Sequence, residues 1–473
     1  AHRRPVAATP PPTPVPGQTP TPITTCPAGS LWTFLLYLAA DYADQGSLSS
    51  AYSEARAALA TVNNGCVQFA IQIDGPASIG QPTIGDTRRW VVRPHQPPEP
   101  ALEIGEASTA DGEALAQFII WGQHTLPADH YYLAIADHGD GARGIAWDHT
   151  TDLNNNAYLS AAAIRNVLER TDIAKIDIVH LDACSMGLLD VAYQLREKVK
   201  YLLTSQYLGW GFFAYADYAQ AVTVAIPPAD LAARIVDRYA ALAKHLGLPY
   251  TLAAWNLTRI EPVKNGVDAL AILLKAWVGN DNNHARRDQL NGLRNESQSF
   301  NSDLDYINTP LDAYLDLFDW LAHLQRANLN ADITLAATKL LAELQRADGL
   351  ILANSAQSNH LPPQYHNGAA VELGGAHGVS LFYPLEGEMR LALPAQAVQS
   401  AAIADTPVFS YTQLYADYLN PRLFTFTVAT HWDEFLRAAY GAPGPDTPLA
   451  PPSPPLAPLL VPKQAIYLPV VMR

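Results

Sequence analysis

Short segments that are apolar on both faces recur along the first half of the chain, and they constrain its fold more than any other feature. Each segment ends in polar residues and is followed by a stretch with helical spacing, so strands and helices are predicted to alternate. Strands with two apolar faces are typical of a parallel sheet that is covered by helices on both sides. The sequence therefore predicts an α/β fold with a mostly parallel sheet flanked by helices. The predicted strands are residues 31–38, 67–73, 131–136, 176–181 and 201–204.

The composition changes along the chain and predicts four parts. The first part is rich in Pro and Thr and cannot bury enough apolar surface to fold, so we expect an extended linker. In the third part, long helical segments dominate, and we expect a helix-rich C-terminal subdomain packed on the α/β domain. The last part is Pro-rich with a short apolar end, which is either a surface-sorting or docking element or a strand that packs back on the body. The predicted parts are residues 1–29, 30–250, 251–440 and 441–473.

The charge of the chain argues against one class of partner. There are 30 Lys and Arg against 45 Asp and Glu, which gives a formal net charge of -15. Such a surface repels phosphate backbones, so nucleic acid is not expected as a partner. The apolar runs are too short to span a bilayer, so we expect no membrane span, and we expect a monomer. The chain begins without an apolar signal stretch, which fits the mature form of a secreted or cell-surface protein.

The three cysteines are Cys26, Cys66 and Cys184. An odd number in a secreted protein suggests one unpaired thiol. Cys26 and Cys66 could form a disulfide, which would leave Cys184 as the thiol. Three buried, reduced cysteines are the alternative, and the sequence does not decide between the two.

Two predicted strands end in residues that can carry out nucleophilic catalysis. His138 and Gly139 follow one strand, and Cys184 follows another. Because the carboxyl ends of neighbouring parallel strands meet at one edge of a sheet, we expect these residues to lie close together. A thiolate is the attacking species of a cysteine peptidase, and a nearby imidazole takes or balances its proton. The N–H groups of Gly139 and Cys184 could then stabilise the oxyanion of a tetrahedral intermediate.

The Cys184 thiol is predicted to be reactive because it lies just before a predicted helix, residues 187–199. The positive end of that helix is expected to lower the thiol pKa. The alternative is that Cys184 is a small buried hydrophobic residue, as cysteines beside strand ends commonly are. Two other histidines compete for a site role: His180 is expected to be buried within a strand, and His149 either lines the cleft or lies in solvent.

Several ordered motifs resemble those of clostripain-like cysteine peptidases. Ile135-Ala136-Asp137-His138-Gly139 resembles the histidine block of that family, and Leu181-Asp182-Ala183-Cys184-Ser185-Met186-Gly187 resembles its nucleophile block. The likeness extends from about residue 30 to residue 440. The further matching segments are residues 31–41, 204–206, 209–211, 378–384 and 432–436.

The resemblance implies a fold and an activity. The family groups with caspases, legumains and gingipains, so it implies a caspase-like α/β sandwich and an endopeptidase that cleaves after Arg or Lys, often with self-cleavage. On that pattern Cys184 is the nucleophile and His138 the general acid/base. Asp182 matches the acidic residue that lines the S1 pocket, where a carboxylate pairs with a substrate guanidinium. The alternative for Asp182 is that it caps the following helix.

A second acidic residue of the family's pocket is matched poorly. Asp217 is the candidate, but the segment 211–217 is rich in aromatic residues, which leaves a strict preference for Arg open. Self-processing is a subsidiary hypothesis, because basic residues lie between the two catalytic blocks. These residues are Arg143, Arg165, Arg170 and Lys175.

No cofactor is expected, and calcium is left open. Two Asp/Asn clusters, residues 152–156 and 280–283, offer oxygen ligands but lack the spacing of an EF-hand, so turn formation explains them better. We assign no metal ligand from the sequence. The motifs of zinc peptidases, P-loop proteins and Gly-x-Ser-x-Gly serine hydrolases are absent from the sequence.

Two functions of different classes follow. The first is a secreted cysteine endopeptidase with peptide or protein substrates, whose activity is lost in Cys184→Ala. The second is a non-catalytic surface module for adhesion or glycan binding, suggested by the Pro-rich arms, the many Tyr and Trp residues and the acidic surface. Ligand binding by such a module is expected to survive Cys184→Ala.

Overall fold

The computed structural model describes most of the region between the Pro-rich ends of the chain. The Pro-rich tail, most of the predicted linker, His149, Lys175 and both Asp/Asn clusters lie outside the described residues. The described residues are 25–41, 47–75, 87–148, 157–171, 176–279, 285–300, 312–384 and 424–440.

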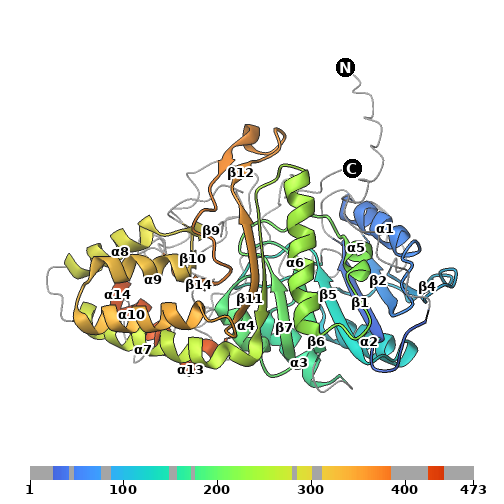
Figure 1. The fold of residues 1–473 in the computed structure, drawn as a ribbon, viewed down its shortest axis with the longest axis horizontal. Helices are drawn as coiled ribbons and strands as arrows, with labels where there is room; N and C mark the ends of the chain where they lie inside the picture. Colours follow the sequence, from blue (N-terminus) through green and yellow to red (C-terminus); the bar gives the residue numbers. More distant parts are fainter. Residues whose placement is uncertain are drawn as a thin grey trace, which may run out of the picture.

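A large central sheet organises the molecule (Figure 1), with the strand order β11-β8-β7-β6-β5-β1-β2-β3-β4. The five central strands, from β7 to β2, are parallel to one another, and the strands on either side of them are antiparallel. Every residue of β1, β2 and β6 is buried, as expected for strands that are apolar on both faces. The predicted α/β fold class is confirmed. The strands are Trp32–Ala39 (β1), Val67–Asp74 (β2), Arg88–Val92 (β3), Leu102–Glu103 (β4), His130–Ala136 (β5), Ile176–Asp182 (β6), Val199–Thr204 (β7), Tyr250–Asn256 (β8) and Ile351–Gln357 (β11).

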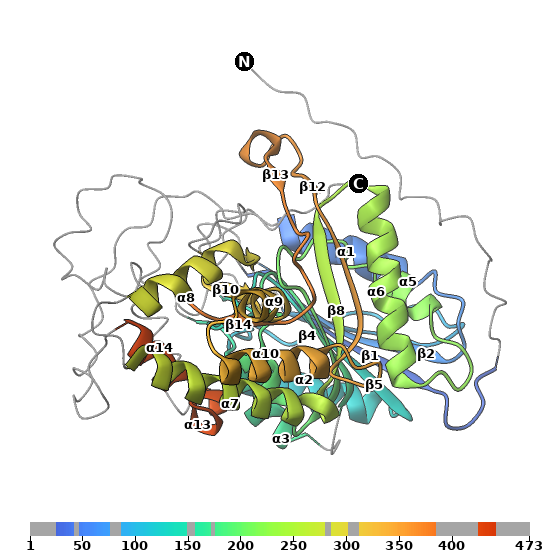
Figure 2. The same ribbon diagram turned by 60° about the vertical axis from the view of Figure 1, so that its left-hand side comes forward.

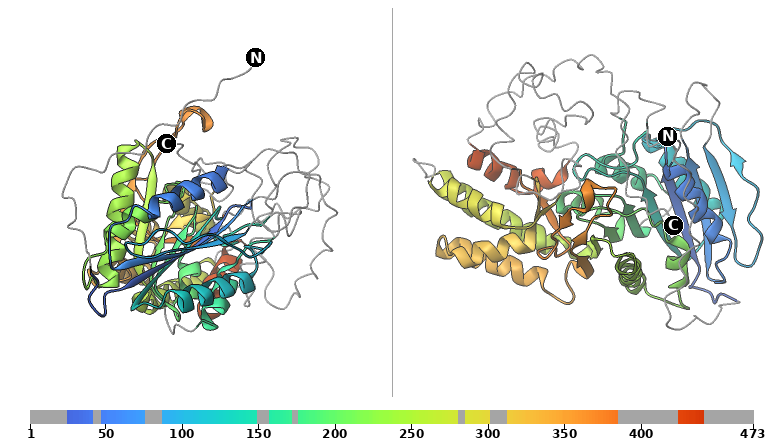
Figure 3. Two further views of the ribbon diagram at one scale, coloured as in Figure 1. Left: turned by 90° about the vertical axis from the view of Figure 1, so that its right-hand side faces the viewer. Right: turned by 90° about the horizontal axis from the view of Figure 1, so that it is seen from above.

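Helices cover both faces of this sheet (Figure 3). One layer holds α1, α5 and α6, and the opposite layer holds α2, α3 and α4. Ser160 caps α3, because its side chain accepts a hydrogen bond from the N–H of Ala163 at 3.1 Å. The helices of the two layers are Ser47–Leu59 (α1), Tyr215–Gln220 (α5), Pro228–His245 (α6), Gly112–Thr125 (α2), Ala161–Glu169 (α3) and Leu189–Leu195 (α4).

The C-terminal part is rich in helices that pack on one another beyond the β11 side of the sheet (Figure 1). It also forms a small sheet of order β14-β10-β9, and β12 pairs with β13 in an arm that projects past the central sheet (Figure 2). The helices are Ile260–Gly279 (α7), Ala285–Glu296 (α8), Leu317–Ala327 (α9), Ala331–Leu344 (α10), Thr425–Ala429 (α13) and Trp432–Tyr440 (α14), and the strands are Ser299–Phe300 (β9), Tyr314–Asp316 (β10), Asn359–His360 (β12), Ala370–Val371 (β13) and Ser380–Phe382 (β14).

The two folded parts share one sheet. The boundary predicted at residue 250 falls within β8, and β11 from the C-terminal part pairs with β8 in antiparallel register. Gln206, in the loop after β7, also reaches this part: its Nε2 donates to Asp316 at 3.0 Å and to Ser380 at 2.8 Å. The four-part division of the chain therefore stays a prediction.

One predicted helix is shorter than expected. The helix predicted over 187–199 is limited to α4, because Gly187 donates its N–H to the carbonyl of Ser205 and Leu188 forms a bridge with Ser380. A distant segment thus supplies backbone partners that compete with a helix.

Cys26 and Cys66 form a disulfide across 40 residues of sequence, and Cys184 is a free cysteine. The pairing that the sequence left open is therefore settled. Among the described helices, none is both long and apolar enough to cross a membrane.

Candidate active site

His138 and Cys184 occupy equivalent positions beyond two adjacent strands. Strands β5 and β6 are parallel, and Ala136 at the end of β5 lies opposite Asp182 at the end of β6. Each site residue follows two positions after its partner in this pair. Because adjacent strands lie about 4.8 Å apart, the two loops leave the sheet side by side.

The backbone of Gly139 packs directly on the nucleophile loop. A Cβ atom at position 139 would lie 2.6 Å from the carbonyl oxygen of Cys184 and 2.7 Å from the Cβ of Ala183. Real Cβ atoms do not approach other atoms so closely, so only glycine fits here. The structure thus brings His138, Gly139 and Cys184 together at one edge of the sheet.

The loop that carries His138 is held by its own hydrogen bonds. The side chain of Asp137 accepts the N–H of Trp147 at 2.5 Å, and the N–H of Asp140 bonds to the carbonyl of Gly144 at 3.0 Å. The hydroxyl of Tyr314 donates to the carbonyl of Asp140 at 3.0 Å. His138 itself is 9% exposed. The imidazole therefore sits on a well-supported loop with limited access to solvent.

Cys184 lies in a tight turn between β6 and α4. Ser185, the next residue, has φ +57°, which is unusual for a residue with a Cβ, and its N–H bonds to the carbonyl of Tyr207 at 2.9 Å. The Sγ atom of Cys184 accepts the N–H of Gly209 at 3.4 Å. Cys184 as a whole is 5% exposed. The turn thus presents the sulfur to the loop after β7.

The pKa of the Cys184 thiol is raised to about 12, chiefly by burial; the N–H of Gly209 opposes the rise, and the nearby carboxylates of Asp182, Asp137 and Asp140 add to it. The expected lowering by a helix end is wrong, because α4 begins only at Leu189. The thiol is therefore protonated at neutral pH in this form of the protein.

Asp182 is a buried carboxylate within a cluster of aromatic residues. Its Oδ2 accepts the hydroxyl of Tyr215 at 2.7 Å, and its Oδ1 lies 3.8 Å from Nε2 of His180. Because α4 has no side-chain cap, the alternative that Asp182 caps that helix is wrong. His180 is buried as expected, its Nδ1 lies 2.7 Å from the hydroxyl of Tyr132, and burial lowers its pKa.

Asp217 lies two residues after Tyr215 in α5 and is directed elsewhere. Its side chain is 50% exposed and forms an ion pair with Arg238 of α6. The structure therefore separates the two acids. Asp182 is buried two residues before Cys184, whereas Asp217 lies at the surface, where its ion pair joins α5 to α6.

Gly209 is a site residue that the sequence did not assign a role. Besides donating to the Cys184 sulfur, it packs so closely that a Cβ would lie 2.8 Å from the carbonyl carbon of Ala183. The segment 209–211 belongs to the matched motifs, so its resemblance was the available signal.

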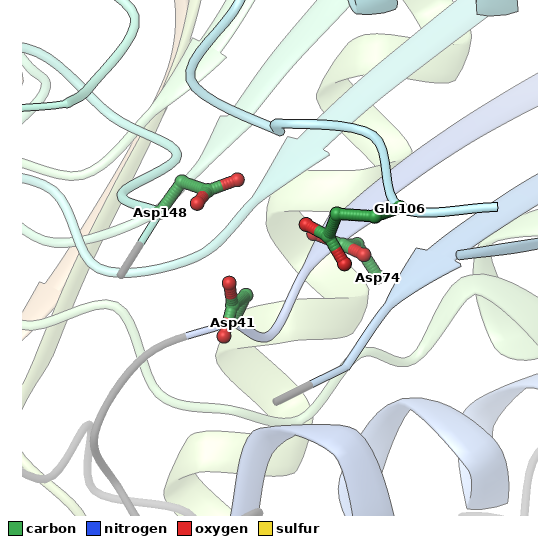
Figure 4. Close-up of side chains that lie close together, drawn as sticks. All are labelled: Asp41, Asp74, Glu106 and Asp148. Atoms are coloured by element: carbon green, nitrogen blue, oxygen red, sulfur yellow. The ribbon is translucent and has the colours of Figure 1, made fainter. Parts of the chain in front are cut away.

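An acidic cluster that the sequence also missed lies elsewhere on this edge of the sheet (Figure 4). It consists of Asp41, Asp74, Glu106 and Asp148, and one carboxylate oxygen of each residue lies within 4.8 Å of one oxygen of every other. Of the described residues, these are the group that could hold a metal ion.

Solved structures share this fold and define the class of protein. An inactive zymogen C11 protease from Parabacteroides distasonis matches with a TM-score of 0.53 and 16% identity over 77% of this chain and 93% of that chain. A secreted C11 cysteine protease from Bacteroides thetaiotaomicron, in complex with an irreversible peptide inhibitor, matches with a TM-score of 0.52 and 17% identity over 81% of this chain and 98% of that chain. The fold is thus the caspase-like α/β fold of C11 cysteine proteases.

Residues 101–438 match the model of Peptidase_C11, the clostripain family. This match covers well over half of the sequence, and the chain therefore belongs to the clostripain family of cysteine endopeptidases. Clostripain from Hathewaya histolytica is 34% identical over an alignment of 101 residues, and the match covers 19% of this chain and 19% of clostripain. Family membership disfavours the alternative of a non-catalytic surface module.

Proposed function

We propose that this chain is a secreted cysteine endopeptidase in which Cys184 is the nucleophile and His138 the general acid/base. The close packing of Gly139 on Cys184 is the observation that carries the proposal. Since His138 precedes Gly139, this contact favours a position of the imidazole beside the thiol. The register of Ala136 opposite Asp182 supports the same arrangement.

The raised thiol pKa fits a reaction in which ionisation accompanies attack. Sγ of Cys184 bonds to the scissile carbonyl carbon while the thiol proton passes to His138. The C–N bond then breaks, and the imidazolium gives its proton to the leaving amine. Water attacks the thioester, His138 accepts its proton, and the departing thiolate takes that proton back. The N–H of Gly209 stabilises negative charge on sulfur, and the N–H groups of Gly139 and Cys184 stabilise the oxyanion.

Asp182 is proposed to select a basic residue at P1. A buried carboxylate near the nucleophile favours a P1 side chain that ends in a guanidinium or ammonium group. A neutral P1 side chain would leave the buried negative charge of Asp182 without a counter-ion. The bond from Tyr215 to Oδ2 orients the carboxylate. Asp217 stays a second candidate, and its ion pair with Arg238 predicts a smaller contribution.

Self-processing is proposed to occur between the two catalytic blocks. Three of the candidates have described side chains: Arg143 is 11% exposed and bonds to Asp140, Arg165 is 25% exposed, and Arg170 is 55% exposed. Arg170 follows directly on α3, so we expect cleavage there rather than at Arg143. Mass spectrometry of intact wild type and Cys184→Ala tests this, because only the active chain is expected to be cut.

Secretion is supported by the disulfide between Cys26 and Cys66, because such bonds persist in oxidising compartments. We further propose peptide or protein substrates and a monomeric state.

The test of the proposed function is hydrolysis of fluorogenic peptides with Arg, Lys or Leu at P1. We expect wild type to cleave the Arg and Lys peptides and Cys184→Ala to cleave none. Turnover that persists in the correctly folded Cys184→Ala variant would refute the proposal.

A further inference from the structure

Strand β10, in the C-terminal part, reaches both loops of the proposed active site. Its outer residues, Tyr314 and Asp316, are two positions apart, so their side chains leave the same face of the strand. Tyr314 contacts the loop that carries His138. Asp316 contacts the loop after β7, which packs on the turn that follows Cys184. One short strand is therefore joined to the two loops whose separation decides whether the thiol and the imidazole can react.

The hydroxyl of Tyr314 bridges two backbone groups of the loop that follows His138. It donates to the carbonyl of Asp140 at 3.0 Å and accepts the N–H of Ala142 at 3.2 Å. The ring packs on Gly141, where a Cβ atom would lie 2.5 Å from Cζ of Tyr314. Gly141 has φ +49°, a conformation that glycine adopts without strain. The buried ring and its hydroxyl together hold this loop in one conformation.

The carboxylate of Asp316 is fully buried and holds the second loop through Gln206. Its Oδ2 accepts Nε2 of Gln206 at 3.0 Å and the N–H of His377 at 2.7 Å. Its Oδ1 accepts the N–H of Asp319, in the first turn of α9, at 2.9 Å. Hydrogen bonds to an ionised acceptor are stronger than those between neutral groups. Gln206 is thus anchored to a carboxylate that is itself fixed at both oxygens.

Gln206 lies directly against the turn that carries the proposed nucleophile. A Cβ atom at Gly187 would lie 3.0 Å from Cγ of Gln206, and the N–H of Gly187 donates to the carbonyl of Ser205 at 2.8 Å. On the other side, the carbonyl of Gly187 accepts the N–H of Ser380, in β14, at 2.8 Å. Strand β14 pairs with β10. The turn after Cys184 is therefore enclosed between the loop after β7 and the small sheet.

We propose that Tyr314 and Asp316 are positioning residues and that β10 sets the distance between His138 and Cys184. The inference rests on the proposed function, because only a reaction between these two side chains requires that distance. Each positioning residue acts through a backbone loop and not on the reacting atoms. A displacement of a reacting group by about 1 Å costs about 100-fold in rate, whereas a peptide can still bind. Loosening either loop therefore lowers kcat and leaves KM nearly unchanged.

Hydrolysis of a fluorogenic peptide with Arg at P1 by the full chain tests the role of Tyr314. The reactive sites are counted by titration with an irreversible peptidyl inhibitor. Tyr314→Phe removes the hydroxyl and keeps the ring, and kcat per titrated site is expected to fall by about tenfold or more, with KM within about twofold of wild type. A merely structural role would reduce the number of reactive sites and leave the kcat of each site unchanged, and that result would overturn the proposal.

Tyr131→Phe is the matched control. The hydroxyl of Tyr131 also accepts a backbone N–H, that of Ala128 at 3.0 Å, but it lies at the amino end of β5, opposite the site. Its kcat per titrated site is expected to equal that of wild type. Equal losses in Tyr131→Phe and Tyr314→Phe would contradict a specific role for β10.

Asp316→Asn tests the second loop. An Asn side chain has one acceptor oxygen, so it cannot serve the donors on both sides of the carboxylate. We expect the same pattern, a lower kcat per titrated site at a similar KM, and an unchanged kcat would remove Asp316 from the assignment. If Asp316→Asn does not fold, as judged by circular dichroism, Tyr314→Phe still decides the proposal.

Hydrogen exchange separates this inference from the proposed function. Exchange of the Ala142 amide, which donates to the Tyr314 hydroxyl, is expected to rise in Tyr314→Phe and to match wild type in Tyr131→Phe. A wild type that cleaves no peptide would overturn the proposed function and this role with it. An active wild type that Tyr314→Phe equals in both kcat and exchange would overturn the role of β10 alone.

Discussion

Gly139 packs on Cys184 so closely that a Cβ at position 139 would lie 2.6 Å from the Cys184 carbonyl oxygen. The contact fixes the loop of His138 against the turn that carries the proposed nucleophile. It forms because β5 and β6 are adjacent parallel strands whose last residues lie in register.

Gly139→Ala is therefore expected to lower kcat/KM by about 100-fold, because the added methyl group pushes the imidazole away from the sulfur. Peptide hydrolysis and Tm, measured together, distinguish this effect from unfolding. Gly292→Ala in α8 is the matched control, since a Cβ there meets nothing within 4 Å, and its activity is expected to be unchanged. Full activity in Gly139→Ala would show that the loop contact is irrelevant to the reaction.

Asp182→Asn is expected to reduce the preference for Arg and Lys over Leu at P1 by about 10- to 100-fold. That factor corresponds to the free energy that a hydrogen bond to a charged group contributes. The change keeps the acceptor for Tyr215 and removes only the negative charge. A P1 peptide library measures the preference. Asp177→Asn, at a buried acid on the opposite end of β6, is the control and is expected to leave the preference intact. An unchanged preference in Asp182→Asn would assign the pocket to another residue.

The raised pKa of Cys184 predicts a specific dependence of stability on pH. The folded state keeps the thiol proton up to a pKa of about 12, whereas the unfolded chain releases it near pH 8.5. The free energy of unfolding therefore falls above about pH 8.5, by about 1.4 kcal/mol per pH unit, while Cys184→Ser lacks this contribution. Urea unfolding of intact chains at pH 7 to pH 10 is expected to show wild type losing about 2 kcal/mol relative to the variant. A difference that stays constant with pH would mean that the thiol is not protected from ionisation.

The disulfide is expected to contribute to stability and not to the chemistry. Cys66 precedes β2, at the amino end of the strand, whereas the site lies at the carboxyl edge of the sheet. Replacing Cys26 and Cys66 by Ser is expected to cost about 2–4 kcal/mol in the free energy of unfolding, because the bond closes a loop of 40 residues. Urea unfolding and kcat/KM at 25 °C check the two parts. A loss of kcat/KM in the folded double variant would show that the disulfide also shapes the site.

The strands and their ends could be predicted from the sequence because the signal is local. An apolar run on both faces specifies β1, β2, β5 and β6, and a polar residue directly after such a run lies at the carboxyl edge. That is why His138 and Cys184 could be placed at one edge without a structure.

Features that depend on distant partners could not be predicted. Gly187 and Leu188 are not helical, because Gly187 donates its N–H to the carbonyl of Ser205 and Leu188 forms a β-bridge with Ser380. The thiol pKa is raised because the loop after β7 helps to bury the sulfur, which no local pattern reveals.

The acidic cluster was missed for the same reason. Its members lie in four segments between Asp41 and Asp148, and each acid alone is unremarkable in the sequence. The two Asp/Asn clusters are local patterns, whereas the cluster in the structure requires the ends of β1, β2 and β4 to meet the loop after β5.

The central claim is that Cys184 attacks with the help of His138. Its most direct measurement is the rate and the site of covalent labelling by an irreversible peptidyl inhibitor with Arg at P1, followed by intact mass and peptide mapping. The account predicts one adduct, on Cys184, that is absent in Cys184→Ala, forms far more slowly in His138→Ala, and forms at the wild-type rate in His124→Ala, a change in an exposed histidine of α2. An adduct on another residue, or equal labelling rates in wild type and His138→Ala, would contradict it.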